Sequence, residues 1–319
     1  MTLHEITIEV TQRCPNRCIY CSSLSDATKT QYLDYKTICR VVDDAKSLGA
    51  KSVSLSGGEP FLHPDIIKIA EYIHAQGLQC NLYSSGIMLS KEGKPTSVPS
   101  KILEAIKDKV FKLIVNIEAA NEKDYNIIMG TDFGGFSLMK TTIRNAVAMG
   151  IIVEAHMVPM KLNYQQIPDI ANLCIDLGIT QLSFLRLVAQ GRAQDNLQQV
   201  LLEAEELETA KRLMKEAAAR QNIKIRQGVP FRDGAKRINC LTGICKLDVR
   251  YDGKVYPCEA FKNDNLKQIE ADADNVKDKS FKEIYRSSIY LTQVRSLLEK
   301  FQSEQTCETC MKQYYTRND

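Results

Sequence analysis

Three cysteines stand close together near the start of the chain, at Cys14, Cys18 and Cys21, in a C-x3-C-x2-C spacing. Pro15 and Asn16 within this segment favour a loop. Thiolates are soft ligands that select zinc or iron–sulfur clusters. A cubane cluster normally takes four cysteines, so three ligands would leave one iron with the open position that catalytic sites keep. The ordinary alternatives are a zinc knuckle that lacks its fourth ligand, or three unrelated buried thiols.

A second group of cysteines lies near the other end of the chain and consists of Cys240, Cys245, Cys258, Cys307 and Cys310. Between them, two strand-like runs at 246–251 and 254–257 flank Asp252-Gly253, which is typical of a hairpin with a type I′ turn. On spacing alone, this region is compatible with zinc as well as with an iron–sulfur cluster.

Strand and helix patterns alternate between these two cysteine groups. We expect strands at 4–10, 52–56, 78–83, 111–117, 151–158 and 181–186, and helices at 34–48, 64–76, 101–108, 137–149, 165–177 and 203–221. Such alternation is typical of a parallel sheet with helices outside. Six units are too few for a closed eight-stranded barrel, so the sequence predicts an α/β fold with an open (β/α)6 barrel. We expect the barrel to span 1–222 and a smaller domain with the hairpin to span 223–319.

Residues that could bind a ligand or take part in a reaction follow the predicted strands at their carboxyl ends. These are Gly57, Gly58 and Glu59 after the second strand, Ser84 after the third, Asn116 and Glu118 after the fourth, and Arg186 after the sixth. Barrels of this kind carry their chemistry at the carboxyl ends of the strands, so we expect these residues around the cysteine loop. A surface turn, a plain strand end or a solvated arginine is the ordinary alternative for each.

With Tyr20 before the last cysteine and Gly-Gly-Glu-Pro at 57–60, the chain resembles the radical S-adenosylmethionine (radical SAM) superfamily. The resemblance implies a 4Fe–4S cluster on Cys14, Cys18 and Cys21, whose open iron binds S-adenosylmethionine. It also implies a flavodoxin or ferredoxin as electron donor. The cofactor-binding residues that it implies are Tyr20, Gly57, Gly58, Glu59, Ser84, Asn116, Glu118 and Arg186. Among these, Glu59 would hold the methionine amino group and Arg186 the carboxylate.

The C-terminal cysteines resemble the auxiliary-cluster extension called SPASM, in the order Cys240-x12-Gly253-x4-Cys258 followed by a C-x2-C pair. No cysteine follows Cys310, so the region resembles the shortened form called Twitch. The resemblance implies one auxiliary 4Fe–4S cluster on Cys240, Cys258, Cys307 and Cys310. Cys245 is then left over, and we expect a catalytic thiol that donates a hydrogen atom to a substrate radical. A cluster ligand or an inert packed thiol is the alternative.

Composition limits the class of protein. The 319 residues carry a net charge of +3 with both signs interspersed, so we expect no nucleic-acid partner. No signal peptide and no apolar run long enough to cross a bilayer is visible, so we expect a cytoplasmic protein without a membrane partner.

The resemblance favours a radical SAM enzyme that matures a ribosomally made peptide by epimerisation or cross-linking. A small-molecule dehydrogenase, epimerase or decarboxylase acting on an aminosugar or nucleoside is the alternative enzyme. A non-catalytic iron–sulfur or zinc-binding interaction protein is the alternative of another class. The first strand begins at once, so we expect no N-terminal peptide-binding domain, which counts against an enzyme that reads a leader peptide by itself.

Overall fold

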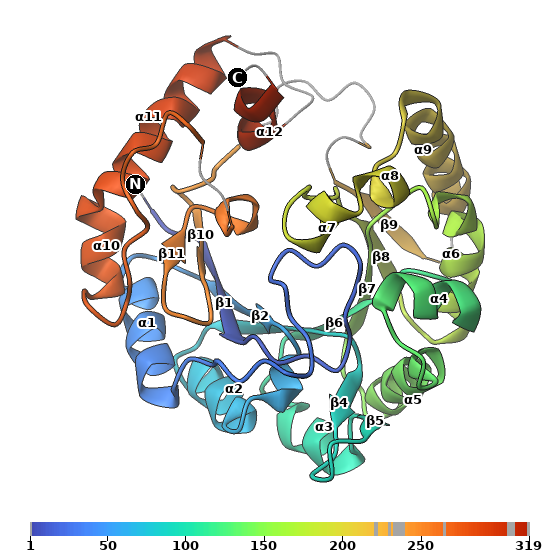
Figure 1. Ribbon diagram of the computed structural model, residues 1–319. Coiled ribbons are helices and arrows are strands. Elements are labelled where there is room, and N and C mark those ends of the chain that lie inside the picture. Colours follow the sequence, from blue (N-terminus) through green and yellow to red (C-terminus); the bar gives the residue numbers. More distant parts are fainter. Residues whose placement is uncertain are drawn as a thin grey trace.

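A curved, largely parallel sheet forms the centre of the molecule, and helices cover its outer side (Figure 1). The computed structural model describes residues 2–219, 223–228, 231, 240–263, 266–304 and 310–317. In these residues the strands of the large sheet follow the order β11-β10-β1-β2-β3-β6-β7-β8-β9. All neighbouring strands are parallel except β10 and β11. The predicted α/β fold with an open barrel is therefore confirmed.

Six strand–helix units form the barrel in the order that the sequence predicts. The strands are β1 (Glu5–Thr11), β2 (Ser52–Gly57), β3 (Gln79–Ser84), β6 (Lys112–Asn116), β7 (Val153–Met157) and β8 (Gln181–Phe184). The helices that follow them are α1 (Tyr35–Ser47), α2 (Ile66–Ala75), α3 (Ser100–Ile106), α5 (Gly135–Ala148), α6 (Ile167–Asp176) and α9 (Ala204–Ala219). The sequence patterns missed the hairpin of β4 (Ile87–Leu89) and β5 (Pro95–Ser97) and the short helices α4 (Glu122–Met129), α7 (Arg192–Asp195) and α8 (Leu197–Val200).

Local signals explain where the first helix begins and ends. Asp34 caps α1, because its Oδ1 accepts a hydrogen bond from the Thr37 backbone N–H at 3.0 Å. Gly49 follows the helix with φ of 103°, a backbone conformation that favours glycine. The chain then enters β2, which pairs in parallel with β1 from Ser52 onward. Both ends of α1 are those expected from the sequence.

Strand β1 separates the apolar core from a polar barrel interior. Ile6, Ile8 and Val10 are fully buried, and they alternate with Thr7 and Glu9, which are also buried. Side chains alternate between the two faces of a strand, and Glu9 lines the cavity described below. The aliphatic residues therefore face the surrounding helices, whereas the polar residues face the interior of the barrel.

The barrel sheet extends beyond its six predicted strands at both edges. After α9 comes β9 (Lys224–Gln227), which pairs with β8. At the other edge, β10 (Lys246–Val249) pairs in parallel with β1 and in antiparallel fashion with β11 (Val255–Tyr256), so the predicted hairpin forms on the barrel sheet itself. The expected domain boundary after residue 222 stays a prediction, but strands on both of its sides share one sheet.

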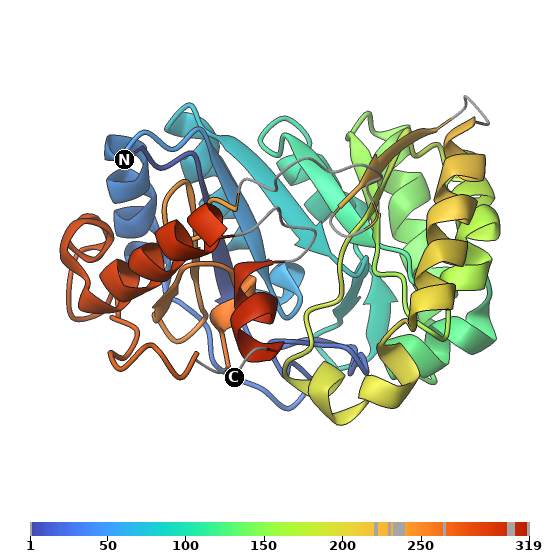
Figure 2. The same cartoon turned by 90° about the horizontal axis from the view of Figure 1, so that it is seen from above.

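The C-terminal helices are α10 (Phe281–Ser287), α11 (Ile289–Glu304) and α12 (Met311–Arg317). The first of them, α10, packs beside α1, and α10 and α11 lie on the side of the molecule opposite α9 (Figures 1 and 2). The Lys282 backbone N–H donates to Asp44 of α1 at 3.1 Å, and the Arg295 guanidinium donates to the Gly243 carbonyl at 2.7 Å. In the described part of the chain, no helix has the length and apolar character needed to cross a membrane.

Candidate functional site

A cavity of about 240 Å³ opens at the carboxyl ends of the barrel strands. Nine of the residues predicted from the sequence line it: Cys14, Cys18, Tyr20, Cys21, Gly57, Gly58, Ser84, Asn116 and Arg186. The loop after β8 and the C-terminal region also contribute to its wall, through Arg192, Glu259 and Lys262. The cavity therefore lies where the cysteine loop, the strand ends and the C-terminal region meet.

The three cysteines of the loop lie close to one another, with Cys14 buried and Cys18 and Cys21 half-buried. Burial raises the pKa of Cys14, and the neighbouring Cys18 and Cys21 raise it further. Burial and the neighbouring Cys21 also raise the pKa of Cys18, whereas the positive charge of Arg192 lowers it. Three thiolates so placed need a cationic centre between them, and the iron of a cluster supplies one. The donor set therefore fits an iron–sulfur cluster.

A single metal ion and a cubane cluster place different demands on their ligands. Among the described residues, no three His, Cys, Asp or Glu side chains converge as the ligands of a single metal ion would. In a cubane, by contrast, each thiolate binds a separate iron atom, so the ligands surround the cluster at a wider spacing.

The two glycines after β2 hold the end of that strand against the start of the cysteine loop. A Cβ on Gly58 would lie 2.2 Å from the Arg13 carbonyl oxygen, and one on Gly57 would lie 2.3 Å from that of Thr11. The Gly58 N–H donates to the Thr11 carbonyl at 2.6 Å. The close approach that these glycines permit is thus to the chain's own backbone, while their exposed side lines the cavity.

Glu59 is fully buried, and both of its carboxylate oxygens are bonded within the protein. Its Oε1 accepts from the Ser84 hydroxyl at 2.9 Å and from the Phe61 N–H at 3.2 Å. Its Oε2 accepts from the Ser85 N–H at 2.8 Å and from the Ser85 hydroxyl at 2.6 Å. Burial raises the pKa of Glu59 to about 7, although these donors oppose the rise. The carboxylate therefore fixes the turn after β3, and its expected contact with an ammonium group stays a prediction.

Glu118 has a similar supporting position after β6. Its Oε1 accepts from the Tyr20 hydroxyl at 2.7 Å and from the Asn116 amide at 3.1 Å, and its Oε2 accepts from the Val158 N–H at 2.9 Å. The side chain is fully buried, and burial raises its pKa to about 7. Glu118 thus orients Tyr20 and Asn116, which line the cavity, and does not line it itself.

Two residues after β8 hold the cysteine loop in place, and we call Arg192 and Asn196 the barrel clamp. The buried Arg192 donates from Nε to the Cys18 carbonyl and from Nη2 to the Ser25 carbonyl, each at 2.7 Å. Asn196 donates to the Ile19 carbonyl at 3.1 Å. The sequence reasoning assigned no role to this segment. Its only signal was the Gly191-Arg192 pair after the last predicted strand.

Gly191 allows the barrel clamp to approach the loop this closely. It has φ of 57°, and a Cβ at this position would lie 2.6 Å from the Cys21 carbonyl oxygen. The next residue, Arg192, donates its backbone N–H to that same carbonyl at 3.1 Å. A side chain at position 191 would therefore push the clamp away from the loop.

The described cysteines of the auxiliary set lie near one another. Burial raises the pKa of Cys258 to about 12, and Cys310 and Cys240 both add to the rise. Burial and Cys310 also raise the pKa of Cys240, whereas the positive charge of Arg186 lowers it. Three of the four expected ligands are thus gathered, and the fourth, Cys307, lies outside the described residues. Arg186 stands between the two cysteine groups, because it also lines the cavity.

Cys245 lies at the opposite end of the barrel from the cavity. It directly precedes β10, whose first residue pairs with Glu5 at the start of β1, and its carbonyl accepts from the N–H groups of His4 and Glu5 at 2.8 and 3.1 Å. The cysteine loop follows the other end of β1, and Cys245 is not part of the cavity wall. Strand direction thus places Cys245 at the amino end of the barrel, and its expected role as a hydrogen-atom donor stays a prediction. This position gives no support to a role as hydrogen-atom donor.

Comparison with known proteins identifies the family. Residues 8–174, more than half of the chain, match the Radical SAM superfamily. The chain belongs to the radical SAM superfamily. Residues 240–311 match SPASM, an iron–sulfur cluster-binding domain. The cofactors of this radical SAM protein are therefore S-adenosylmethionine and 4Fe–4S clusters, as the cysteine spacing and the gathered thiols indicate.

Relatives of known sequence and structure agree with this assignment. The chain is 31% identical over 259 residues to a PqqA peptide cyclase of Ruegeria pomeroyi, covering 79% of this chain and 66% of that protein. It therefore spans slightly less than two thirds of the length of this curated relative.

Solved structures show the same fold at low sequence identity. Streptococcus suis SuiB bound to the precursor peptide SuiA has a TM-score of 0.75 at 15% identity, covering 92% of this chain and 67% of that chain. A native anSMEcpe structure with bound AdoMet and the Cp18Cys peptide has a TM-score of 0.67 at 15% identity, covering 96% and 85%.

Proposed function

We propose that this chain is a radical SAM enzyme that matures a ribosomally made peptide by forming a cross-link. The observation that carries the proposal is the shared cavity, whose wall holds the three loop cysteines together with Glu259 and Lys262 of the C-terminal region. A substrate in this cavity would lie between the site of S-adenosylmethionine and the auxiliary cysteines.

The relatives favour a peptide as the substrate. The curated relative is named a peptide cyclase, and two proteins of the same fold have been solved with peptides bound. Cross-linking is favoured over epimerisation, because epimerisation relied on Cys245 as the hydrogen-atom donor and that thiol lies at the far end of the barrel. The small-molecule alternative has no comparable observation in its favour.

The chain's own residues would hold the reacting groups in place. When bound, the cluster and S-adenosylmethionine supply a 5′-deoxyadenosyl radical that takes a hydrogen atom from the substrate. Glu118 orients Tyr20 and Asn116 on one wall of the cavity, and Glu59 fixes Ser84 on another. Arg186 has no hydrogen bond or ion pair from its Nε among the described residues, so we propose that it binds an anionic group in the cavity, such as the cofactor carboxylate.

The first test is cofactor cleavage. The reconstituted and reduced protein should release 5′-deoxyadenosine from S-adenosylmethionine, and replacing Cys14, Cys18 and Cys21 together by Ala should abolish release while auxiliary iron remains. Cys39→Ala is the matched control, because Cys39 lies on α1 and does not line the cavity. Equal cleavage by the triple variant and the control would refute the assignment.

The second test concerns the substrate. A short peptide encoded beside the gene should lose the mass of two hydrogen atoms on cross-linking, whereas epimerisation leaves the mass unchanged and exchanges one Cα hydrogen with solvent. Mass spectrometry in deuterated buffer separates these outcomes. If the enzyme converts a small molecule and leaves every peptide encoded beside the gene unchanged, the peptide assignment is refuted and the cofactor assignment stays intact.

A further inference from the structure

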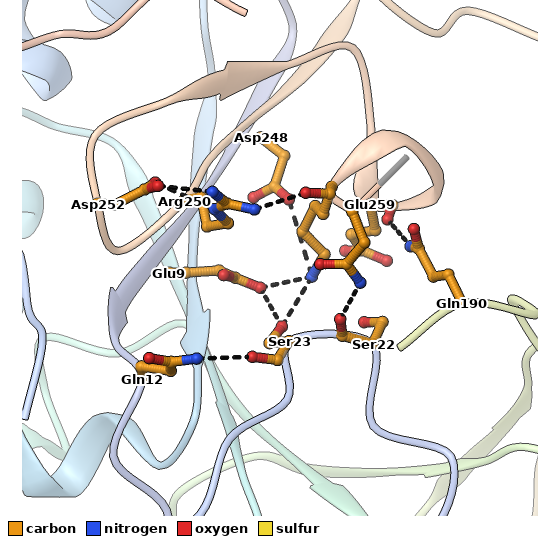
Figure 3. A network of polar contacts seen from close by, with 11 residues as sticks. Glu9, Gln12, Ser22, Ser23, Gln190, Asp248, Arg250, Asp252 and Glu259 are labelled. Carbon is orange, nitrogen blue, oxygen red and sulfur yellow. Dashed lines mark hydrogen bonds and ion pairs between the residues drawn. The ribbon is translucent and has the colours of Figure 1, made fainter. Parts of the chain in front are cut away.

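A second set of contacts reaches the cysteine loop and β1 from the side of the C-terminal region, at Glu9, Ser22 and Ser23 (Figure 3). The residues that make these contacts are Lys262 and Asn263, and we call them the C-terminal clamp. The Lys262 ammonium forms an ion pair with Glu9 of β1 and donates to the Ser23 hydroxyl at 3.1 Å. Asn263 donates to the Ser22 carbonyl. Ser22 and Ser23 directly follow the cluster ligand Cys21. The clamp therefore acts on the loop at the point where it leaves the cluster site.

Glu9 and its neighbours complete this attachment. The Ser23 hydroxyl donates to Glu9 Oε1 at 2.5 Å, and the Gln12 amide donates to the Ser23 carbonyl at 3.1 Å. The Lys262 carbonyl in turn accepts a hydrogen bond from Arg250 at 2.5 Å, and Arg250 is paired with Asp252. The clamp is thus supported from the hairpin of β10 and β11.

The clamp also joins the two groups of cysteines. Lys262 lies four positions after the auxiliary cysteine Cys258, and the short helix Glu259–Phe261 fills the interval. This helix is held to the barrel, because Gln190 donates to the Glu259 carbonyl. A short, structured segment therefore separates an auxiliary ligand from the attachment on the cysteine loop.

The charges in the clamp are buried. The side chain of Lys262 is 6% exposed and that of Glu9 is 2% exposed. Asp248, 3.9 Å from the ammonium, is fully buried, and neither of its oxygens has a hydrogen-bond partner in the described structure. Burial alone would lower the pKa of Lys262, but Glu9 and Asp248 outweigh this effect and raise it. Lys262 therefore keeps its positive charge beside the cavity.

We propose that Lys262 is a positioning residue that ties the cysteine loop to the auxiliary-cluster segment and, through its buried charge, raises the reduction potential of the cluster on Cys14, Cys18 and Cys21. Reduction adds one negative charge to that cluster. A cation held in a medium of low dielectric constant stabilises the added charge more than a solvated cation does. The proposal needs only the cluster and does not depend on the identity of the substrate.

The ordinary alternative is a buried ion pair that contributes only to folding. Removing one partner of such a pair is strongly destabilising, because the other charge stays buried without compensation. Stability alone therefore does not separate the two explanations, whereas the reduction potential of the cluster does.

The test compares four variants of the full chain with both cluster sites reconstituted: Lys262→Met, Lys262→Arg, Glu9→Gln and the double variant of Glu9→Gln with Lys262→Met. The midpoint potential of the loop cluster is measured without substrate, by redox titration followed by electron paramagnetic resonance. Iron content is measured in parallel. Lys279→Met is the matched control, since Lys279 is half-exposed and paired with Asp274 in the same region of the chain.

We expect Lys262→Met to move the potential to more negative values and Glu9→Gln to move it to more positive values. The double variant should return close to the wild-type potential, and Lys262→Arg and Lys279→Met should leave it nearly unchanged. The proposal is overturned if all variants have the same midpoint potential. A loss of iron in some variants, without a change in potential, also overturns it. Where Lys262→Met does not fold, an unchanged potential in Glu9→Gln overturns it equally, because that variant keeps the shape of the side chain.

Discussion

Replacing Arg192 by Met removes the two side-chain hydrogen bonds that this residue contributes to the barrel clamp, without adding bulk. Each bond runs from a guanidinium to a buried carbonyl, of Cys18 and of Ser25, at 2.7 Å. A hydrogen bond to a charged group contributes about 1.5–3 kcal/mol, so the two together contribute about 3–6 kcal/mol to holding the loop. Since about 1.4 kcal/mol corresponds to a factor of ten, the loop should hold its cluster roughly a hundredfold to ten-thousandfold less tightly.

Two measurements test this estimate. Iron release to a chelator should be much faster from the reconstituted Arg192→Met protein than from the wild type. Thermal unfolding of the cluster-free protein should occur about 6 °C or more lower, because about 1 kcal/mol shifts the midpoint by about 2–4 °C in domains of about 150–250 residues, the size expected for the barrel. Arg192→Lys should fall between the two, since it keeps the charge but loses the planar fork.

The matched control is Arg212→Met. Arg212 lies on α9, is 62% exposed and pairs with Glu216 four residues later, an arrangement that contributes about 0.3–0.5 kcal/mol. It should therefore behave like the wild type in both assays. If Arg192→Met matched Arg212→Met in iron release and in melting temperature, the barrel clamp would not hold the loop, and the reasoning from its contacts would be refuted.

Three further substitutions test the supporting residues. Glu59→Ala should weaken S-adenosylmethionine binding at least about tenfold in a calorimetric titration, because charge-assisted bonds of about 1.5–3 kcal/mol each to Ser84 and Ser85 are lost; unchanged affinity would remove its role. In the wild type, the contribution of Glu118 to the free energy of unfolding should decrease as pH rises from 4.5 to about 7. The reason is that the Glu118 carboxyl keeps its proton in the folded state and releases it in the unfolded state. Glu118→Gln should lack this contribution in thermal unfolding of the cluster-free protein, and identical pH profiles would contradict the raised pKa. Cys245→Ala should keep its iron, cofactor cleavage and product; loss of product with intact iron would restore the donor role, and loss of auxiliary iron would make Cys245 a ligand.

Several features of the site could be predicted from local sequence. The spacing of Cys14, Cys18 and Cys21 requires only a loop of a few residues, so it indicates a cluster site without knowledge of the fold. The barrel was likewise predictable, because each strand–helix unit carries its own periodicity and its own end signals, such as Asp34 and Gly49. Parallel strands then bring their carboxyl ends together, which accounts for the nine predicted residues in the cavity wall.

What the sequence left undecided is the direction in which each polar group points. Glu59 was expected to meet a ligand, but its carboxylate is bonded to the turn after β3, 25 residues further along the chain. Cys245 was expected to donate a hydrogen atom to a substrate radical, but pairing of β10 with β1 places it at the amino end of the barrel and outside the cavity wall. Both outcomes depend on which strands become neighbours, and no local pattern encodes that choice.

The two clamps show most clearly the difference between what the sequence predicts and what only the tertiary structure decides. Arg192 and Cys18 are 174 positions apart in the chain, and Lys262 and Glu9 are 253 apart. In the sequence, Arg192, Lys262 and Glu9 look like ordinary charged positions in a loop or a strand. The sequence alone predicted the ligands of the cluster, because ligand chemistry depends on residue type and short spacing. Only the tertiary structure decided which buried charges hold that loop, because such contacts form only when the β8–α7 loop and the C-terminal region pack against the end of β1.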